Sequence, residues 1–226
     1  MQFVGKRCYI TIDEFQQITE YPEKRGGSLL RSYIQFLPNV RFIFAGSKQH
    51  VMQEMFLSTK RPFYQSTAIM ELHPIDMRTY TKFIRGHFAV ANKDITEETI
   101  QNVYERFEGC ITWYIQFISN SLYAMTNIGE ICTTDKVNIA IENILSQLNF
   151  TYSSLLYQLP PKQKEVLFAI CKEGKAKEIT SSRFLKTYKL TASSVQGAIK
   201  GLLDKDFVTC ELGEYKAYGK FFEIWL

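Results

Sequence analysis

Two adjacent carboxylates, Asp13 and Glu14, directly follow a short apolar run from Lys6 to Ile12. A run this short, rich in β-branched and aromatic residues, predicts a buried strand rather than a helix. In parallel sheets, ligands bind at the carboxyl ends of the strands, because loops and helix N-termini converge there. One acid of such a pair can hold Mg²⁺, which prefers carboxylate and water oxygens, while the other orients or deprotonates an attacking water.

The same pair also has a purely structural interpretation. Asp13 can accept backbone N–H groups of a following turn, as a helix cap does. Short motifs produce false positives, so this stretch alone leaves both interpretations open.

A further polar residue, Ser47, ends the next apolar run. Between the two runs lies a helical pattern that extends from Ser28, the expected N-cap, to Pro38. A strand–helix–strand order at this spacing implies parallel strands joined by a right-handed crossover. We therefore expect Asp13, Glu14 and Ser47 to lie side by side at one sheet edge. Taken alone, Ser47 is more simply explained as the turn residue that ends a strand.

The next part of the chain predicts one more strand and several helices. A helix over 49–57 and a third strand, Ala68 to Leu72, should complete a first domain, residues 1–74. Residues 75–150 contain further helical patterns, one of which begins at the N-cap Thr96. Gly109 should end that helix. The aromatic side chains are most simply explained as core, so this part predicts a helical subdomain of the size of a lid.

The last part, residues 151–226, has the pattern of a winged helix. Three short helices are expected, starting near Pro160, Ser181 and Thr191, and a hairpin around Gly213 follows them. The expected fold class is therefore α/β plus all-α, with a partial parallel sheet, a helical lid subdomain and a C-terminal winged helix.

Composition is that of an ordinary globular protein, with 46% hydrophobic and 22% charged residues among 226. No apolar run approaches the about 20 residues that span a bilayer, and the N-terminus lacks signal-peptide features, so we expect a cytoplasmic protein.

The five cysteines are scattered without a Cys-x-x-Cys pair and the three histidines are isolated, which argues against a zinc site or a disulfide framework. The net charge of +4 arises entirely from residues 155–226.

In their order along the chain, these motifs resemble the prokaryotic P-loop ATPases of the STAND/AAA+ type, often called archaeal-type ATPases. The stretch from Cys8 to Gln16 looks like the Walker B strand, and the stretch 42–47 looks like the sensor-1 strand, whose terminal polar residue faces the γ-phosphate. The stretch 61–66 stands where the family carries a Pro-Leu-Tyr-Gly-Arg signature, and 109–116 is similar to its lid-helix motif.

This resemblance implies an ATP-dependent regulatory switch that uses ATP and Mg²⁺. Asp13 would hold Mg²⁺, Glu14 would polarise the attacking water and Ser47 would sense the γ-phosphate. The sequence contains no Gly-x-x-x-x-Gly-Lys-[Ser/Thr] motif, so nothing in it cradles the β- and γ-phosphates. We therefore expect the C-terminal part of such an ATPase, which alone binds no nucleotide and is inactive. A sheet without the P-loop strand would have an open edge, which predicts self-association.

Other positions depart from the family pattern. Ser66 occupies the position of the signature arginine, for which Arg61 could substitute only loosely. Thr112 replaces the proline of the lid motif, and Cys110 replaces one of its glycines.

The alternative function is a winged-helix module that binds DNA or a protein, beside a vestigial ATPase domain. The third helix of a winged helix enters the major groove and the wing contacts phosphate. The outward residues would be Ser193, Ser194, Gln196, Gly197 and Lys200, with Lys216 and Lys220 near the wing. Recognition helices usually carry more Arg or Lys than this one, so a protein contact is at least as consistent with the pattern. A third hypothesis treats the whole chain as a protein-interaction scaffold. No membrane partner is expected.

Overall fold

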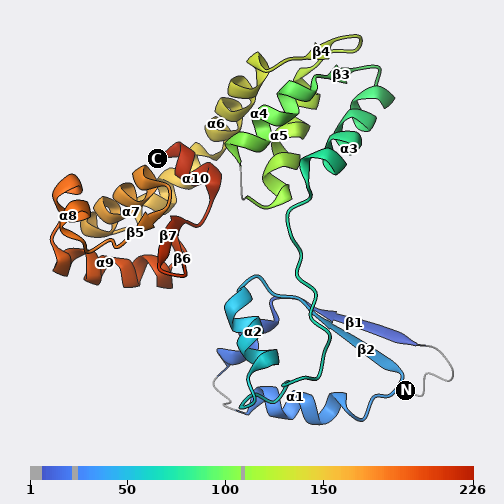
Figure 1. Cartoon of the computed structure of the whole chain (residues 1–226), viewed down its shortest axis with the longest axis vertical. Helices are drawn as coiled ribbons and strands as arrows, with labels where there is room; N and C mark the ends of the chain where they lie inside the picture. Colours follow the sequence, from blue (N-terminus) through green and yellow to red (C-terminus); the bar gives the residue numbers. More distant parts are fainter. Residues whose placement is uncertain (1–6, 22–24, 108–109) are drawn as a thin grey trace. The chain divides into compact units, whose positions relative to one another are not determined.

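The computed structural model describes residues 7–21, 25–107 and 110–226, apart from the side chains of Gln49 and His50. The chain divides into two compact units, Met1–Leu72 and His73–Leu226 (Figure 1). The helix end expected at Gly109 lies outside the described residues. No helix of the described part is long and apolar enough to cross a membrane.

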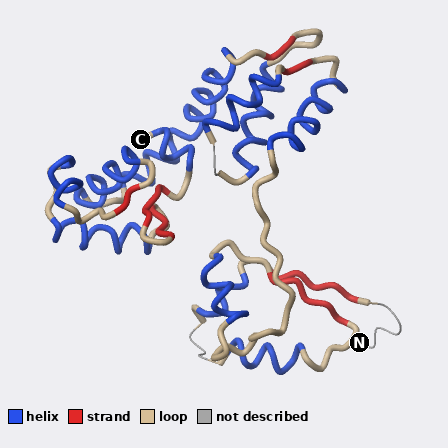
Figure 2. The backbone as a smooth tube through the Cα atoms, viewed as in Figure 1, coloured by secondary structure: helices blue, strands red, loops and turns tan. Residues whose placement is uncertain are grey.

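The first unit is built on two parallel strands, β1 (Cys8–Ile12) and β2 (Val40–Phe44). The crossover between them contains a 3₁₀ helix, η1 (Phe15–Thr19), and α1 (Gly26–Ile34), and α2 (Gln49–Leu57) follows β2. The core of this unit consists of Phe15, Met55, Phe56 and Phe63, against which Ile12 and Phe44 pack from the strands. Figure 2 shows these strands as short segments beside the helices.

Two expectations for this unit are wrong. Ala68–Leu72 is not a strand, because no ladder partner lies beside it among the described residues and Met70 and Leu72 are almost fully exposed. Ser28 is not an N-cap, because α1 already begins at Gly26. The strands are also less buried than expected: Tyr9 and Ile43 are more than half exposed, since the described helices cover only one face of the pair.

The second unit begins with a helical subdomain. Its four helices pack around one core that includes Phe88, Ile118, Leu122 and Val137. The elements are α3 (Met77–Val90), β3 (Asp94–Ile95), α4 (Glu97–Arg106), α5 (Thr112–Met125), β4 (Ile131–Cys132) and α6 (Asp135–Tyr157). The predicted N-cap Thr96 is confirmed, because its side chain accepts the backbone N–H of Thr99 at 3.2 Å.

The winged-helix part follows and has the predicted order of three helices and a hairpin. Its elements are α7 (Pro161–Glu173), β5 (Ala176–Lys177), α8 (Ser182–Tyr188), α9 (Ala192–Asp204), β6 (Val208–Glu211), β7 (Glu214–Ala217) and α10 (Lys220–Trp225). The antiparallel sheet has the order β5-β7-β6. Ser181 and Thr191 cap α8 and α9 with their side chains. The fold is therefore mixed α/β and mostly helical, with short parallel sheets and a C-terminal winged helix.

Candidate functional site

The carboxyl ends of β1 and β2 are joined beyond the strands by backbone hydrogen bonds. Ala45 N–H donates to the Ile12 carbonyl, and Phe15 N–H donates to the Ala45 carbonyl, both at 2.9 Å. Between these bonds Glu14 adopts a left-handed conformation, with φ of 48° and ψ of 40°. Non-glycine residues seldom adopt this conformation, and such residues concentrate at functional sites.

Three polar side chains meet at this edge. Ser47 Oγ donates to Glu14 Oε2 at 3.0 Å, and Gln16 Nε2 contacts the same carboxylate oxygen. Gln16 Nε2 also lies 3.4 Å from Ser47 Oγ. The structure thus brings Glu14 and Ser47 together from adjacent strands, with Gln16 as a third member. Two donors on one carboxylate fix its orientation.

Gln16 is a member of this cluster that the sequence did not predict. Its side chain is only 2% exposed, and Oε1 is buried without a hydrogen-bond partner among the described residues. A Cβ on Gly46 would lie 2.3 Å from Gln16 Oε1 and 2.6 Å from Met52 Sδ, so a larger residue at this position would require both side chains to move. The sequence feature that could have identified Gln16 is its position. It is a polar residue two positions after the acidic pair, next to the apolar positions of η1.

Asp13 lies apart from this cluster. Its side chain is exposed, and Oδ1 accepts the N–H of Glu14 at 2.9 Å. Both interpretations of Asp13 remain compatible with this geometry, because one carboxylate oxygen caps the turn and the other is available to a cation. Among the described residues there is no group of three His, Cys, Asp or Glu side chains that could hold a metal ion.

The side chains of the segment 61–66, which stands where the family carries its signature, make local contacts. Arg61 pairs with Glu54 of α2 through two guanidinium nitrogens, one of them 3.1 Å from Glu54 Oε1. Phe63 is buried in the core of the first unit, and Ser66 Oγ donates to its carbonyl at 2.7 Å. Arg61 is therefore directed at α2, and Ser66 serves the local turn.

The candidate nucleic-acid residues separate into two groups. Ser193, Gln196 and Lys200 are exposed on α9, as is Gly197. Ser194 instead forms the capping box of that helix, where its Oγ donates to the Thr191 carbonyl at 2.8 Å.

The cations near the wing are engaged in ion pairs. Lys216 pairs with Glu214 at 2.8 Å, and Glu214 also pairs with Lys177 at 3.4 Å. The hydrogen bond from Lys216 lowers the pKa of Glu214. Lys220 begins α10 and pairs with Glu223 at 2.5 Å.

All five cysteines are free thiols. Burial raises the pKa of Cys110 and Cys132, and it raises that of Cys171 to about 12. A thiol with a raised pKa stays protonated at neutral pH and is a poor nucleophile. These three cysteines are therefore structural.

Comparisons with known proteins show the fold class. Residues 150–226 match the family model described as a probable winged helix domain. A Walker-type ATPase of Pyrococcus abyssi superposes with a TM-score of 0.61 at 18% identity, over 97% of this chain and 63% of that one. The Orc1 protein of Aeropyrum pernix, solved in complex with DNA, gives a TM-score of 0.50 at 14% identity, over 96% of this chain and 63% of that one. A search of curated proteins found no match.

The chain spans less than two thirds of the length of either solved structure. At these identities the likeness shows a similar fold and no more, and the winged helix of this chain is shown by the family model. The chemistry of this chain has to be argued from its own residues.

Proposed function

We propose that this chain is part of a STAND-type P-loop ATPase that acts as an ATP-dependent regulatory switch. The observation that carries the proposal is the 3.0 Å hydrogen bond from Ser47 Oγ to the Glu14 carboxylate, across the ends of two adjacent parallel strands. In this function Glu14 polarises the attacking water, Asp13 holds Mg²⁺ and Ser47 senses the γ-phosphate.

The hydroxyl of Ser47 can donate its hydrogen bond to either of two acceptors, the Glu14 carboxylate or a phosphate oxygen. Mg²⁺–ATP, when bound, supplies the phosphate that water attacks and the metal that neutralises its charge. Ser47 has one hydroxyl proton, so it donates either to Glu14, as observed, or to a phosphate oxygen. Donation to phosphate would release one of the two donors from the Glu14 carboxylate, which could then accept a hydrogen bond from water. Gln16 would keep the carboxylate in place during that exchange.

The residues present fit a magnesium ion bound together with nucleotide. Mg²⁺ usually keeps several waters and takes only one or two carboxylates, with substrate phosphates completing its shell. Asp13 is exposed and has one oxygen in use, on the N–H of Glu14. A single carboxylate of this kind is enough for such a site.

The residues that cradle the phosphates would come from a different segment or chain. The 226 residues contain no P-loop motif. The described strands of the first unit form a sheet of only β1 and β2, so both outer edges can accept a further strand. A P-loop strand added to this sheet would bring its loop to the edge where Glu14 and Ser47 lie.

Calorimetry with ATP and Mg²⁺ tests the proposal, on this chain and on a longer protein that includes a P-loop segment. We expect only the longer protein to bind, and Glu14→Gln in it to abolish turnover while retaining nucleotide binding. Asp13→Ala should abolish turnover and weaken the dependence of binding on Mg²⁺. If the longer protein does not bind nucleotide, Asp13 and Glu14 are structural and the proposal is wrong.

A second candidate function is binding of DNA or a protein through the winged helix. It is supported by the match of residues 150–226 to a winged helix model and by the exposed polar face of α9. Fluorescence anisotropy with duplex DNA at several salt concentrations distinguishes the two partners. For DNA, Lys200→Ala should weaken binding and reduce the salt slope by about one, whereas Lys162→Ala on α7 should not. Absence of salt-dependent binding would favour a protein partner.

A further inference from the structure

The net charge of the chain is concentrated in one short stretch, residues 172–189. This stretch contains six Lys and Arg against two acids, Glu173 and Glu178, and its excess of +4 equals that of the whole chain. All other residues are therefore neutral in sum. The stretch runs from the C-terminal end of α7 through β5 and α8 to Lys189, the C-cap of α8. The positive charge of the protein is thus a local feature of the winged-helix part.

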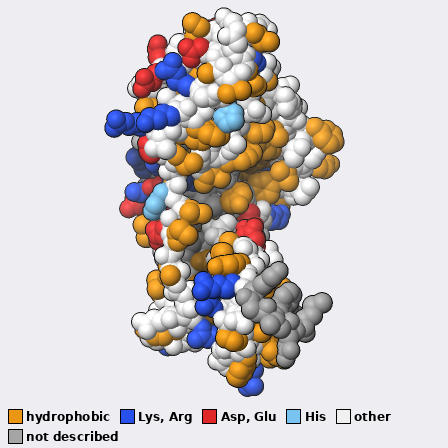
Figure 3. Space-filling model, turned by 90° about the vertical axis from the view of Figure 1, so that its right-hand side faces the viewer, with side chains coloured by type: hydrophobic (Ala, Val, Ile, Leu, Met, Phe, Trp, Pro, Cys, Tyr) orange, Lys and Arg blue, Asp and Glu red, His pale blue; other side chains and the backbone are white. Residues whose placement is uncertain are grey.

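Helix α8 presents only cations and hydroxyl groups to solvent. Phe184 is buried in the winged-helix core, and Leu185 and Tyr188 pack against that core. The exposed residues of the helix and its C-cap are Ser182, Arg183, Lys186, Thr187 and Lys189. Exposed surfaces normally carry both signs of charge, as on the face of the molecule in Figure 3, where acidic and basic side chains lie close together. The exposed side of α8 departs from this mixture.

The C-terminal end of α7 adjoins this side of α8 through Glu173. Tyr188 Oη donates to Glu173 Oε1 at 2.9 Å, and Arg183 Nη2 lies 3.8 Å from Glu173 Oε2. The Arg183 side chain is still 85% exposed, so its guanidinium remains open to a further anion. Lys172 and Lys175, which stand on either side of Glu173 in the chain, are also exposed. Since exposed charges act over about 8 Å at physiological salt, these lysines add to the positive potential around α8.

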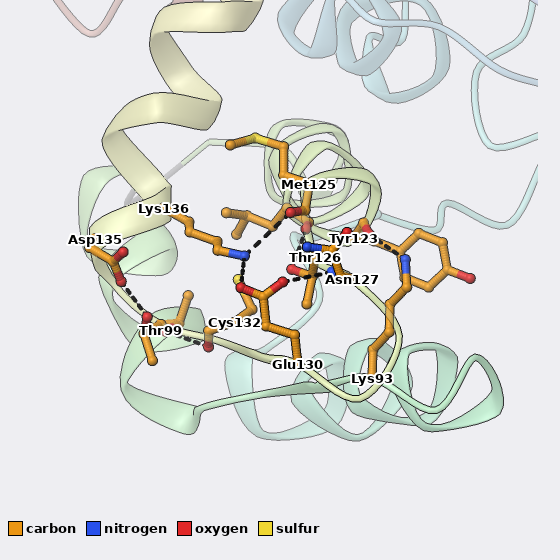
Figure 4. A network of polar contacts seen from close by, with 12 residues as sticks. Lys93, Thr99, Tyr123, Met125, Thr126, Asn127, Glu130, Cys132, Asp135 and Lys136 are labelled. Atoms are coloured by element: carbon orange, nitrogen blue, oxygen red, sulfur yellow. Dashed lines mark hydrogen bonds and ion pairs between the residues drawn. The ribbon is translucent and has the colours of Figure 1, made fainter.

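Most cations of this stretch are not used inside the protein. Four lysines make no ion pair with any other residue that the structure describes, namely Lys172, Lys175, Lys186 and Lys189. Lys177 differs, because it pairs with Glu214 of the wing at 3.4 Å. Lys136 of the helical subdomain is likewise engaged, since it pairs with Glu130 at 2.5 Å (Figure 4). The four unpaired lysines keep their charge for an external anion.

Large hydrophobic side chains are absent from this surface. None is exposed from residue 169 to residue 211, a range that the structure describes throughout. Protein interfaces need apolar or aromatic anchors, and helices that lie on membranes bury an apolar face. Proteins that bind single strands stack the bases on aromatic side chains. The phosphate backbone of a duplex is instead bound by Arg, Lys, Ser and Thr, which are the residue types that α8 exposes.

We propose that α8 and the adjoining end of α7 bind the phosphate backbone of duplex DNA, independently of its base sequence. Arg183 and Lys186, one helical turn apart on the exposed side of α8, contact phosphates. Ser182 and Thr187 donate hydroxyl hydrogen bonds beside them.

Helix α9 provides no comparable attraction. Its only charged residues are Lys200 and Asp204, whose charges cancel. The affinity for DNA therefore comes mainly from α8. This inference rests on the second candidate function, for which it names the partner and the contact surface.

Fluorescence anisotropy of the full chain with a labelled DNA duplex, at a series of salt concentrations, tests the inference. The double variant Arg183→Gln with Lys186→Gln should weaken binding by about tenfold at low salt. It should also reduce the slope of log affinity against log salt by about two, one for each lost phosphate contact. A second duplex of equal length and unrelated sequence should bind equally well, because phosphates carry no sequence information.

The matched control is Arg78→Gln with Lys82→Gln. It removes the same two charges, also from exposed positions of one helix, α3, in the helical subdomain. This variant should leave the affinity and the salt slope unchanged. Thermal melts by circular dichroism should show both double variants melting with the parent protein, because all four side chains are exposed.

Four outcomes would overturn the inference. Binding that Lys200→Ala weakens and the α8 variant does not would place the contact on α9, and the second candidate function would stand without this inference. Absence of salt-dependent binding would remove both. Equal losses in the α8 and α3 variants would show an effect of net charge rather than a contact at α8. A strong preference for one of the two duplexes would show base recognition instead of backbone binding.

Discussion

Phe221 and Phe222, which are neighbours in α10, are buried in two different cores. Phe221 is 1% exposed and packs against Phe107 and Tyr114 of the helical subdomain, with centroids 5.5 and 5.1 Å away. Phe222 is 7% exposed and belongs to the winged-helix core. Tyr114 Oη also accepts the N–H of Lys220 at 3.0 Å. The last helix of the chain thus ties the two halves of the second unit together.

We predict that Phe221→Ala lowers the free energy of unfolding of the second unit by about 3–5 kcal/mol, the usual cost of emptying a buried phenylalanine site. Urea denaturation followed by near-ultraviolet circular dichroism measures it. Phe150→Ala is the control, because that exposed ring should contribute less than about 0.5 kcal/mol. Equal effects of the two variants would show that α10 does not tie the halves together.

The close contact between Gly46 and Gln16 gives a second prediction. Gly46→Ala should lower the free energy of unfolding by about 1–3 kcal/mol, because its Cβ forces the buried glutamine to move. Gly86→Ala is the matched control. A Cβ at Gly86 meets no atom within 4 Å, and alanine in a helix interior is favoured over glycine by about 0.5–1 kcal/mol, so that variant should be more stable. The two variants should shift the urea midpoint in opposite directions, and a stabilising Gly46→Ala would contradict the packing.

The structural features that the sequence predicts correctly are mostly those that local signals determine. Caps such as Thr96 and Thr191 act within one helical turn, so their hydrogen bonds could be predicted from neighbouring residues. The order of strand, helix and strand likewise predicted that β1 and β2 are parallel.

Features that the sequence did not predict depend on contacts between residues far apart in the chain. Gln16 lies against Gly46, thirty residues away in the chain, which leaves space for its buried side chain. Helix α10 is too short for a periodic pattern, and its position follows from Phe221 and Phe222 entering separate cores. The stretch 68–72 has strand propensity, but a strand also needs a partner, which propensity does not report.

Glu130 makes the stability of the second unit depend on pH. The hydrogen bond from Lys136 lowers the pKa of Glu130 below its ordinary value, and the N–H of Asn127 adds to this effect. A carboxyl whose pKa is lowered on folding stabilises the fold above its unfolded pKa, and this contribution is lost as the pH falls through the folded pKa. We predict that Glu130→Gln melts at a lower temperature than the parent protein at pH 7. The difference should close as the pH falls below about 4, the ordinary carboxyl range.

Thermal melts by circular dichroism across this pH range check the prediction. Glu142→Gln, which alters an exposed residue of α6, should melt with the parent protein at pH 7. A difference between Glu130→Gln and the parent that persists at acid pH would mean that the amide changes packing rather than charge.

The uncovered face of β1 and β2 predicts self-association of the first unit. Tyr9 and Ile43 are more than half exposed on adjacent strands, and a parallel pair is normally covered on both faces. The double variant Tyr9→Thr with Ile43→Thr keeps β-branched residues in both strands and removes most of this apolar surface. Light scattering at increasing concentration should show less association for the variant than for the parent. The control is Leu212→Thr, at the exposed tip of the wing, which should associate like the parent. If Leu212→Thr reduces association as much as the double variant does, the contact is not specific to the face of β1 and β2.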